Sequence, residues 1–570
     1  MTTSKPWLAH YDSGVPATLE PYPERTLLDY LDESVRARPG HPISIFKGRA
    51  LSVAELDRES NAFAAALGAL GVRQGDRVAL CLPNCPQFLV AQYGVWKAGA
   101  IVCPFNPTYT AREMTDALSA TGAETLVVLN RFYAQVKEIQ PHTSVRRVIT
   151  TGIKEYLPAM LRVAYTLLKE RKDGERIALA SGDERLDELL VRFARAAPPA
   201  ITIAPNDEAA VLMSGGTTGT PKGVLGRHRN MVIAGFQLRA WLGSTMREWT
   251  DTLMVPLPLF HTFAHTGAQS LGLINHNPLV LIANPRDLRD LLKEINRVKP
   301  SFICAVPTLL SGIMNHRLAR SGKVDFRSIK LCFVGATALM AETKKRWEKA
   351  TGGVIVEGYS LTEAQMAVVA NPAQGEKKTG SVGMPLPDVE VRIVDADDGE
   401  TPKATGEVGE VVVAAPQLME GYWQRPDETS AMLRDNGRGE RSLYTGDLGY
   451  LDADGYLFIV DRKKDLIKTS GFQVWPREIE EVLSTHPAVA EVGVVGLPDV
   501  AKGEIVKAWI VFRPGMTASE TELKAFCREQ LAPYKVPSRF EFVNDLPKTQ
   551  VGKVLRRALK EREFLSSRGA

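Results

Sequence analysis

Apolar and polar residues follow one another in blocks along the first 360 positions, and these blocks are typical of strands followed by helices. Short apolar runs at 77–82, 124–129 and 209–214 have the length of buried strands. The segments 52–71 and 87–100 carry apolar residues at helical spacing, and the first of them begins at a serine and ends at a glycine. This alternation predicts parallel sheets covered by helices, which is an α/β fold.

The pattern continues and then changes toward the C-terminus. Further strands and helices are expected at 278–283, 286–298, 302–307, 329–335, 340–351 and 354–360. From about residue 380, runs such as VEVRIVD, GEVVVA and GYLFIVD alternate with glycine turns, which indicates antiparallel strands. We therefore expect a large N-terminal domain at 1–463, made of layered α/β subdomains and a β-rich subdomain. A small α+β domain is expected at 464–570.

Composition places the chain among ordinary globular proteins. Its 570 residues are 44% hydrophobic and 24% charged, and the formal net charge is only +4. Near-neutrality over this length gives no argument for nucleic acid, so we expect no such partner. The six cysteines form no CxxC pair and lie in apolar surroundings, which favours reduced, buried thiols. No secretory h-region and no apolar run of about 18 residues occurs, so we expect a cytoplasmic protein.

The segment 154–172 differs from its surroundings because it is both apolar and basic. As a helix it places Leu157, Leu161, Tyr165 and Leu168 on one face. It carries five basic residues against two acidic ones. An ordinary surface helix packed on its domain is one interpretation, and peripheral contact with the inner face of a membrane is the other.

The string MSGGTTGTPKGV at 213–224 is the strongest chemical signal in the sequence. Glycines let backbone amides come close to an anion, hydroxyl groups add donors, and Lys222 supplies a mobile positive charge. The string is not a Walker A loop, because Lys222 follows a proline and precedes a glycine. It predicts a phosphate-binding loop that combines Lys222 with Ser214, Gly215, Gly216, Thr217, Thr218 and Gly219.

Further strings carry polar residues that suit a nucleotide. EGYSLTE ends a predicted strand and offers Glu363, a carboxylate of the kind that Mg²⁺ prefers. YTGDLGY offers Asp447, since a carboxylate can accept hydrogen bonds from both ribose hydroxyls, and Arg462 follows shortly after it. LPKTQVGKVLRR places Lys553 on a turn that contains a glycine.

In this order and spacing, these strings resemble the adenylate-forming family, which comprises acyl-CoA synthetases, firefly-type luciferases and the adenylation domains of peptide synthetases. The resemblance covers the chain from about residue 24 to about residue 560. It implies that the glycine-rich loop holds the ATP phosphates, and that Thr362 and Glu363 lie at the phosphate and Mg²⁺ positions. It also implies ribose binding by Asp447 and Arg462, and an adenine pocket lined by Gly335, Ala336, Thr337, Glu357, Gly358 and Tyr359.

The implied reaction joins a carboxylate to the α-phosphate of ATP and expels pyrophosphate. Because both reacting groups are anions, catalysis needs positioning and cations more than a general base. Lys222 and Mg²⁺ on Glu363 supply part of this charge. Lys553 matches the family's lysine that bridges the carboxylate and the α-phosphate. In the second step the thiol of coenzyme A attacks the acyl-adenylate, so ATP, Mg²⁺ and CoA are all expected.

The resemblance implies that one site serves both steps through rotation of the small C-terminal domain. The pivot lies two residues after the ribose-binding arginine, which makes Lys464 the expected hinge. After rotation, the loop 468–474 is expected to replace Lys553, with Lys468 and Gly471 beside the pantetheine of CoA. Gly471 suits this place because it has no side chain.

Within the family, the chain looks most like the long-chain fatty-acid–CoA ligases. The strings that carry this likeness are PLPLFHTFA, VDRKKDLIKTSGFQVWPREIEEVL and GLPDVAKGE. In the first of them, His261 matches a position that gates the acyl pocket. VGATAL and GYSLTE depart from the usual family strings, which leaves the acyl length open. We therefore expect an acid–thiol ligase that acts on a fatty acid, ATP and CoA.

Other functions fit the same residues and stay open. A fatty acyl-AMP ligase, another carboxylate–CoA ligase and a luciferase-like oxygenase share the first step. Outside enzymes, the alternative is a silent acyl- or nucleotide-binding protein, although such a protein does not need Lys553. The state of assembly is also open, with a homodimer among the options.

Overall fold

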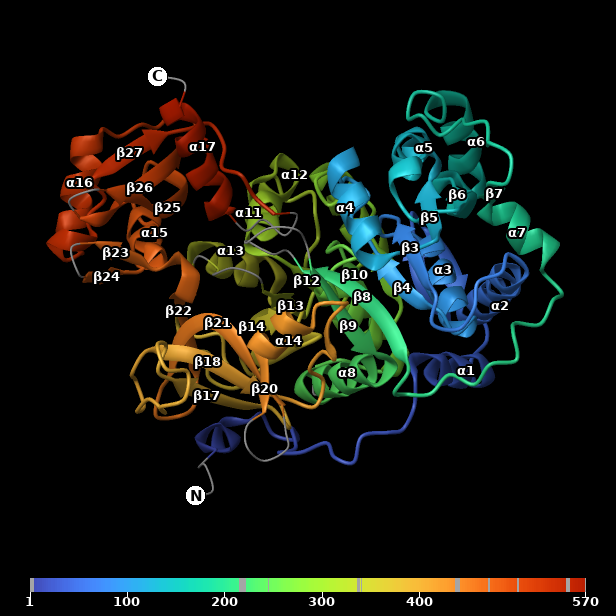
Figure 1. Ribbon diagram of the computed structural model, residues 1–570, viewed down its shortest axis with the longest axis horizontal. Helices are drawn as coiled ribbons and strands as arrows, with labels where there is room; N and C mark the ends of the chain where they lie inside the picture. The colour runs from blue at the N-terminus through green and yellow to red at the C-terminus, as the bar shows by residue number, and fades with distance from the viewer. Residues whose placement is uncertain are drawn as a thin grey trace.

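The structure is a computed structural model, and it contains four β-sheets with helices on their faces (Figure 1). Two large sheets come from residues 42–422, a third sheet comes from residues 390–462, and a fourth follows in the last hundred residues. The residues that the structure describes are 5–214, 222–243, 245–335, 339, 341–435, 441–469, 472–499, 502–549 and 554–568.

The eight-stranded sheet carries the residues on both sides of the glycine-rich loop. Its strands, in spatial order, are β19 (Gly421–Tyr422), β9 (Lys222–Arg227), β8 (Glu208–Ser214), β4 (Ile101–Pro104), β3 (Arg77–Cys81), β5 (Thr125–Leu129), β6 (Arg147–Thr151) and β7 (Glu184–Arg185). The strands from β8 to β7 run parallel, whereas β9 is antiparallel to β8. The helices of this layer are α2 (Val53–Ala69), α3 (Pro86–Lys97), α4 (Ala111–Thr121), α5 (Tyr133–Ile139) and α7 (Leu186–Arg192).

The nine-stranded sheet carries the EGYSLTE string. Its strands, in spatial order, are β16 (Met384–Pro385), β15 (Met366–Ala370), β14 (Val354–Leu361), β13 (Leu331–Val334), β12 (Phe302–Ala305), β10 (Leu253–Val255), β11 (Leu279–Leu281), β1 (Pro42–Phe46) and β2 (Arg49–Ser52). Its helices include α10 (Leu288–Val298), α11 (Pro307–Asn315), α12 (Arg317–Arg320) and α13 (Ala341–Thr351). The central strands β11, β10, β12, β13 and β14 are parallel, so their carboxyl ends meet at one edge.

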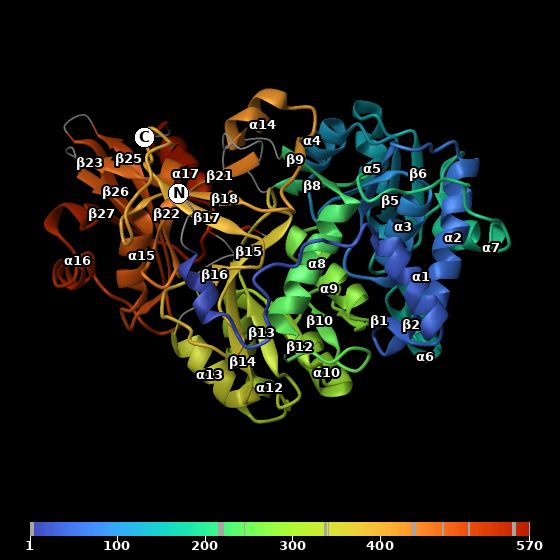
Figure 2. The same ribbon diagram turned by 90° about the horizontal axis from the view of Figure 1, so that it is seen from below.

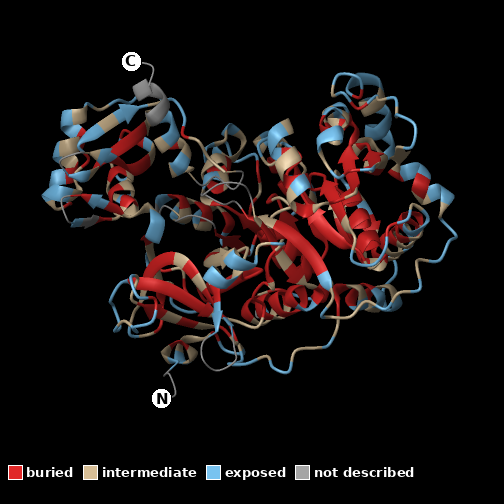
Figure 3. Ribbon diagram, in the orientation of Figure 1, coloured by how far each residue is buried: buried red, intermediate tan, exposed pale blue. Residues whose placement is uncertain are grey.

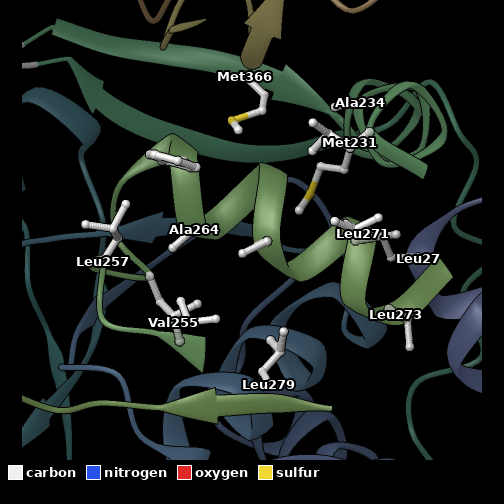
Figure 4. Packing of buried hydrophobic residues seen from close by; sticks show 14 of the residues in the cluster. Leu27, Met231, Ala234, Val255, Leu257, Ala264, Leu271, Leu273, Leu279 and Met366 are labelled. Carbon is white, nitrogen blue, oxygen red and sulfur yellow. The ribbon is translucent and has the colours of Figure 1, made fainter. Parts of the chain in front are cut away.

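Three helical segments pack between the two large sheets, namely α8 (His228–Leu242), the π-helix η5 (Phe263–Ala268) and α9 (Gln269–Ile274). Helix α1 (Leu27–Ala37) packs beside them. Figure 4 shows Met231 of α8 and Leu271 of α9 in one apolar cluster with Val255 and Leu279 of the second sheet. Burial of such side chains is the main stabilising term of a fold of this kind. Figure 3 shows that the buried residues concentrate in these two sheets and in α8.

The third and fourth sheets adjoin each other in sequence. The third contains β17 (Glu390–Val394), β18 (Gly409–Ala414), β21 (Arg441–Leu451), β20 (Leu433–Asp435) and β22 (Leu457–Arg462), with α14 (Pro426–Met432) beside it. The fourth contains β24 (Phe472–Val474), β23 (Ile467–Thr469), β26 (Gly503–Phe512), β25 (Val489–Asp499) and β27 (Arg539–Phe542). Its helices are α15 (Pro476–Ser484), α16 (Glu520–Arg528) and α17 (Arg556–Arg568).

The fourth sheet has apolar clusters of its own, which are separate from the large cluster between the first two sheets. Figures 1 and 2 show it at one end of the molecule, opposite α1 and α2. The predicted α/β class is confirmed, with a large N-terminal part and a smaller C-terminal part. The boundary at residue 463 stays a prediction.

Two local features differ from the sequence expectations. The sequence predicted a glycine-rich turn after the strand at 209–214 and then a helix from about residue 228, which is α8, but strand β9 lies between them and pairs with β8 along its whole length. Its sequence KGVLGR contains two glycines and no clear alternation, so neither period is visible in it. A Cβ on Gly223 would lie 2.5 Å from Val211 Cγ1, and one on Gly226 would lie 2.4 Å from Gln365 Oε1. Both glycines therefore serve close packing rather than a turn.

The second difference concerns the basic apolar segment, which forms η4 (Ile153–Tyr156) and α6 (Ala159–Leu168). The expected face does not form as one unit, because Leu157 precedes the helix and Tyr165 turns inward to donate to Asp173 at 3.1 Å. Leu161 and Leu168 of the expected face are exposed, and Met160 and Leu167 are exposed beside them. Among the described residues, no helix has the length and apolar character that a bilayer span needs.

Candidate active site

Asp447 is the centre of a buried polar group at the edge of the third sheet. It lies opposite Arg462 in the antiparallel pair β21–β22, and Arg462 Nε is 3.0 Å from Asp447 Oδ1. The Tyr359 hydroxyl, which β14 supplies from the second sheet, donates to Asp447 Oδ2 at 2.6 Å. Asp447 is only 4% exposed, so its carboxylate depends on the Tyr359 hydrogen bond and the Arg462 ion pair more than on water. Three predicted nucleotide-binding residues are thus brought together.

The Asp447 carboxylate shifts the pKa values of both neighbouring side chains. Attraction to Asp447 is the largest cause that raises the pKa of Arg462 above its ordinary value. Burial, and then the Asp447 carboxylate, raise the pKa of Tyr359 well above its ordinary value, so its hydroxyl stays a donor at neutral pH. The result is a carboxylate that is held by one hydrogen-bond donor, Tyr359, and one ion-pair partner, Arg462, and this arrangement suits a ribose diol.

A second polar group lies around Glu363, at the end of the turn that follows β14. Glu363 Oε1 accepts a hydrogen bond from the Tyr422 hydroxyl at 2.8 Å. Lys222 Nζ lies 4.8 Å from the centroid of the Tyr422 ring and forms an ion pair with Glu428 at the start of α14. Lys222 itself pairs with Ser214 across β9 and β8, so these two residues flank the glycine-rich loop. The group therefore joins a cation, a carboxylate and the loop ends.

The two polar groups belong to one electrostatic environment. Arg462 is influenced by the charge of Glu363 as well as by that of Asp447. Lys464, in the 3₁₀ turn η6 (Lys463–Asp465), has a pKa lowered first by burial and then by Arg462, and it also interacts with Asp447 and Lys222. The predicted hinge residue thus lies within reach of both groups.

Glycines allow the close approach of strands where an adenine pocket was expected. A Cβ on Gly335 would lie 3.4 Å from the Gly358 carbonyl oxygen and 3.6 Å from Phe263 Cε1. A Cβ on Gly358 would lie 3.0 Å from Phe333 Cζ. Glu357 is engaged elsewhere, because its Oε1 accepts from Lys344 Nζ at 3.1 Å. Gly335 and Gly358 therefore lie closely packed at this edge of the second sheet, while the Glu357 side chain is directed to α13.

An apolar cavity begins beneath this edge. Phe263 and Phe333 meet edge to face at its end, with ring centroids 5.6 Å apart. The cavity continues between α8, the π-helix and the second sheet, past Leu242, Leu253, Leu271, Phe302, Leu331 and Met366. Its walls carry almost no polar surface, which suits an alkyl chain, and because the free space is only about 20 Å³, a long chain enters it only when the wall side chains move.

His261 lies just before the π-helix that forms one wall of this cavity. Its Nδ1 accepts a hydrogen bond from the backbone N–H of Phe263 at 3.3 Å. Burial lowers the pKa of His261 to about 4. The imidazole is therefore neutral at physiological pH, with its proton on Nε2, and His261 itself does not line the cavity.

Other predicted site residues are placed less informatively. The Thr362 carbonyl accepts from the backbone N–H of Gln365 at 2.9 Å, which closes the turn after β14. Lys468 lies on β23 of the fourth sheet, where its backbone N–H donates to Glu504 at 2.7 Å, and no described contact links it to the groups above. The predicted residues Gly215, Gly216, Thr217, Thr218, Gly219, Ala336, Thr337, Gly471 and Lys553 lie outside the described residues.

The structure adds residues that sequence reasoning missed. Tyr422 and Glu428 contact Glu363 and Lys222, although neither lies in a string with a recognisable chemical pattern. The described residues contain no group of three or more His, Cys, Asp or Glu side chains that could enclose a metal. Within the described part of the chain, only one carboxylate oxygen of Glu363 has a side-chain partner, which suits Mg²⁺ that shares its ligands with phosphate, the usual mode for this ion.

Comparisons with known proteins identify the family of the chain. A family model described as AMP-binding enzyme matches residues 31–423, and one described as AMP-binding enzyme C-terminal domain matches residues 478–553. The chain is 37% identical to a long-chain-fatty-acid–CoA ligase of Bacillus subtilis over 99% of both chains. It is also 37% identical to a protein of the same name from Escherichia coli, over 98% of both chains.

Solved structures of related fold bind nucleotides. A crystal structure of an anthranilate CoA ligase in complex with anthranoyl-AMP superposes with a TM-score of 0.82 at 26% identity, over 95% of this chain and 98% of that one. The ATP-bound MatB protein from Rhodopseudomonas palustris superposes with a TM-score of 0.79 at 27% identity, over 95% of this chain and 99% of that one.

Proposed function

The chain belongs to the family of AMP-binding enzymes, and from this premise we propose that it ligates a long-chain fatty acid to coenzyme A through an acyl-adenylate. The observation that carries the proposal is the apolar cavity that begins at Phe263 and Phe333, directly beneath the edge formed by Gly335 and Gly358. An acyl chain in this cavity places its carboxylate toward the polar groups around Asp447 and Glu363.

In the first step, a carboxylate oxygen of the fatty acid forms a bond to the α-phosphorus of ATP, and the bond from that phosphorus to the bridging oxygen breaks. Asp447 accepts the ribose hydroxyls, and Arg462 and Tyr359 hold its oxygens in place. Lys222 turns from Glu428 to the phosphates, and Lys553 lies between the two anions. Glu363 holds Mg²⁺, which when bound neutralises charge on the phosphate oxygens.

In the second step, the sulfur of CoA attacks the acyl carbonyl, the bond to the phosphate oxygen breaks, and AMP leaves. We propose that rotation at Lys464 removes Lys553 from the site and brings in Lys468 and Gly471 of the loop 468–474. The fourth sheet suits such a motion, because its apolar clusters are complete without the rest of the molecule.

The test is the release of AMP and pyrophosphate with fatty acids of different lengths, with and without CoA. We expect both products with long-chain acids and CoA, and little turnover with acids too short to fill the cavity. Acyl-adenylate that accumulates at the same level with CoA would identify an acyl-AMP ligase instead. Absence of pyrophosphate with every acid would identify a silent binding protein. Sedimentation of the same preparation measures whether the chain forms a homodimer.

We also propose that α6 touches a membrane surface. Its outward side exposes Met160 by 86%, Val163 by 60%, Leu167 by 77% and Leu168 by 75%. Burial of one such side chain contributes about 1.5–3 kcal/mol, so the exposure of four of them on one side of a helix is unfavourable in water. A fatty acid is itself concentrated in membranes, so an enzyme that consumes it gains from contact there.

The charges around α6 favour an anionic lipid surface. The acidic residues point inward: Glu170 pairs with Lys154, Asp173 accepts from Tyr165, and Glu155 accepts from Thr151 at 2.6 Å. The exposed charges of the segment are basic and comprise Arg162, Lys169, Arg171 and Lys172. Each basic residue near an anionic bilayer contributes about 1 kcal/mol, which adds to the apolar term.

Vesicle co-sedimentation tests this contact with a matched control. The double variant Val163→Glu/Leu167→Glu places charge on the exposed face, whereas Val191→Glu does the same at an equally exposed valine on α7, 79% exposed. We expect the double variant to lose binding to vesicles that contain phosphatidylserine and the control to keep it. Equal binding of both variants to the vesicles would refute contact through α6. Ligase activity measured in detergent tests the proposed function independently of this result.

A further inference from the structure

The guanidinium of Arg556, at the start of α17, lies among three carboxylates. Its Nη1 is 2.7 Å from Asp461 Oδ1 and 3.1 Å from Asp465 Oδ2, and its Nη2 is 2.7 Å from Glu480 Oε2. The Arg556 side chain is only 16% exposed, and that of Asp461 is 2% exposed. Burial alone lowers the pKa of Arg556, but the carboxylates of Glu480 and Asp461 outweigh it and raise the pKa. Arg556 is therefore a permanent buried cation whose position is fixed by these partners.

The three partners lie on different sides of the predicted pivot. Asp465 and Glu480 follow Lys464 in the sequence, as Arg556 does, whereas Asp461 precedes Lys464 on β22. A rotation at Lys464 thus carries Arg556 together with Asp465 and Glu480 and separates it from Asp461. Removal of one partner of a buried pair usually costs several kcal/mol, because it leaves a buried charge unpaired. Arg556 does not become an unpaired buried charge in the rotation, because Asp465 and Glu480 move together with it.

The contacts across the pivot converge on one strand end. Between residues that the structure describes, three hydrogen bonds join the two sides of Lys464, and all three end on β22. Arg556 binds Asp461, the backbone N–H of Arg477 donates to Asp461 Oδ2 at 2.8 Å, and Arg477 Nη1 donates to the Ile459 carbonyl at 2.9 Å. A small number of bonds at one point can hold an orientation and still be released.

Asp461 and Arg556 are each adjacent in sequence to a residue of the proposed chemistry. Asp461 directly precedes Arg462, the partner of Asp447, and its Oδ1 accepts from the Arg462 backbone N–H at 2.7 Å. Arg556 follows Lys553 by three residues, a stretch that spans at most about 11 Å of chain. A bond between Asp461 and Arg556 therefore ties the ribose-binding strand to the segment that carries Lys553.

We propose that Asp461 and Arg556 are positioning residues that hold the C-terminal part in the orientation of the adenylation step and separate for the thioester step. The inference rests on the proposed two-step function. It assigns the two residues no contact with substrate. Their bond acts through Lys553, whose approach to the α-phosphate depends on the orientation that the bond maintains.

Separate assays of the two half-reactions test this inference with Asp461→Asn, which keeps the shape of the side chain and removes its charge. A hydrogen bond to a charged group contributes about 1.5–3 kcal/mol, so we expect fatty-acid-dependent exchange of pyrophosphate into ATP to fall at least about tenfold. Formation of acyl-CoA from supplied acyl-adenylate is expected to stay within about twofold of the unmodified enzyme, since Asp461 is already released in that step.

Arg557→Gln is the matched control, because Arg557 is the next residue and pairs only with Glu561 on the exposed side of α17 in the described structure. It is expected to leave both half-reactions unchanged. A second readout is cleavage by trypsin at Lys463 and Lys464 in η6, which is expected to accelerate in Asp461→Asn and not in Arg557→Gln.

The outcomes separate this inference from the proposed function. If Asp461→Asn slows both half-reactions equally, or neither, the positioning role is wrong even though the enzyme is a ligase. If the unmodified protein shows no fatty-acid-dependent exchange, the proposed function itself fails. Trypsin cleavage that is equally fast in Asp461→Asn, Arg557→Gln and the unmodified protein would also overturn the orientation-holding bond.

Discussion

Tyr359 and Tyr422 offer a matched pair of substitutions that separates the two polar groups of the site. The Tyr359 hydroxyl donates to Asp447 at 2.6 Å, and the Tyr422 hydroxyl donates to Glu363 at 2.8 Å. Tyr359→Phe and Tyr422→Phe each remove one hydroxyl and keep the ring. If Asp447 holds the ribose, Tyr359→Phe weakens AMP and ATP alike. If Glu363 serves Mg²⁺ and the phosphates, Tyr422→Phe weakens magnesium-bound ATP and spares AMP.

The size of the effect follows from the partners that remain. A hydrogen bond to a charged acceptor contributes about 1.5–3 kcal/mol, and Asp447 keeps its ion pair with Arg462 in Tyr359→Phe. We therefore expect the lower end of this range, about 1.5 kcal/mol, which is roughly a tenfold increase in the Kd of AMP. The hydroxyl is protonated throughout the neutral range, because the pKa of Tyr359 is raised by burial and by Asp447. The loss should therefore not depend on pH between about 6 and 8.

Isothermal titration calorimetry with AMP, and then with ATP and Mg²⁺, measures both effects directly. We expect the Kd of AMP to rise about tenfold in Tyr359→Phe and to stay unchanged in Tyr422→Phe. The Kd of magnesium-bound ATP is expected to rise in both variants. Wild-type affinity of Tyr359→Phe for AMP would refute the ribose assignment of Asp447. An equal loss of AMP in Tyr422→Phe would refute the separation of the two groups.

Three further predictions concern the core, the cavity and the half-reactions. Burial lowers the pKa of His228 to about 4 and that of His265 to about 3, so between pH about 6.5 and 4 the unfolded state binds more protons than the folded state. The free energy of unfolding should therefore fall as the pH is lowered through this window, by about 2 kcal/mol per histidine at pH 5. Thermal unfolding measured at several pH values should show a weaker dependence of stability on pH in His265→Phe than in the unmodified protein. A Cβ on Gly267, in the cavity wall, would lie 2.7 Å from Met366 Cε. Gly267→Leu should therefore raise kcat/KM for shorter acids relative to kcat/KM for longer acids. If this ratio is unchanged, the cavity is not the acyl site. Lys553→Ala should abolish adenylation and largely spare thioester formation from supplied acyl-adenylate, and equal loss of both would contradict the exchange of Lys553 for the loop 468–474.

Periodicity alone predicted the layered part of the fold, because buried parallel strands and amphipathic helices each leave a strong pattern. The run at 209–214 is β8, and the helix expected from residue 228 is α8 (His228–Leu242). Strand β9 was missed, because its glycines pack against Val211 and Gln365 and give no alternation. Its position matters for function, since it fixes Lys222 opposite Ser214.

Recognition of motifs predicted several polar residues that the structure brings together, but it did not predict the side chains that contact them. Asp447, Arg462 and Tyr359 come from two sheets and form the group that the resemblance implied. Tyr422 has no motif, because its role depends on the approach of β19 to Glu363, which no local pattern records. The same reason applies to Arg556, whose carboxylate partners are spread over α15 and both sides of η6.

In the proposed reaction the fatty acid is activated before CoA takes part, and one rapid-mixing experiment tests this order of steps directly. The enzyme is mixed with ATP, Mg²⁺ and a long-chain fatty acid in the absence of CoA, and pyrophosphate is measured; CoA is then added, and AMP and acyl-CoA are measured. We predict a burst of one pyrophosphate per site that requires the fatty acid, followed after CoA by an equal amount of acyl-CoA and AMP. Release of pyrophosphate only after CoA is added, or at the same rate without fatty acid, would contradict an acyl-adenylate formed in the site around Asp447 and Glu363.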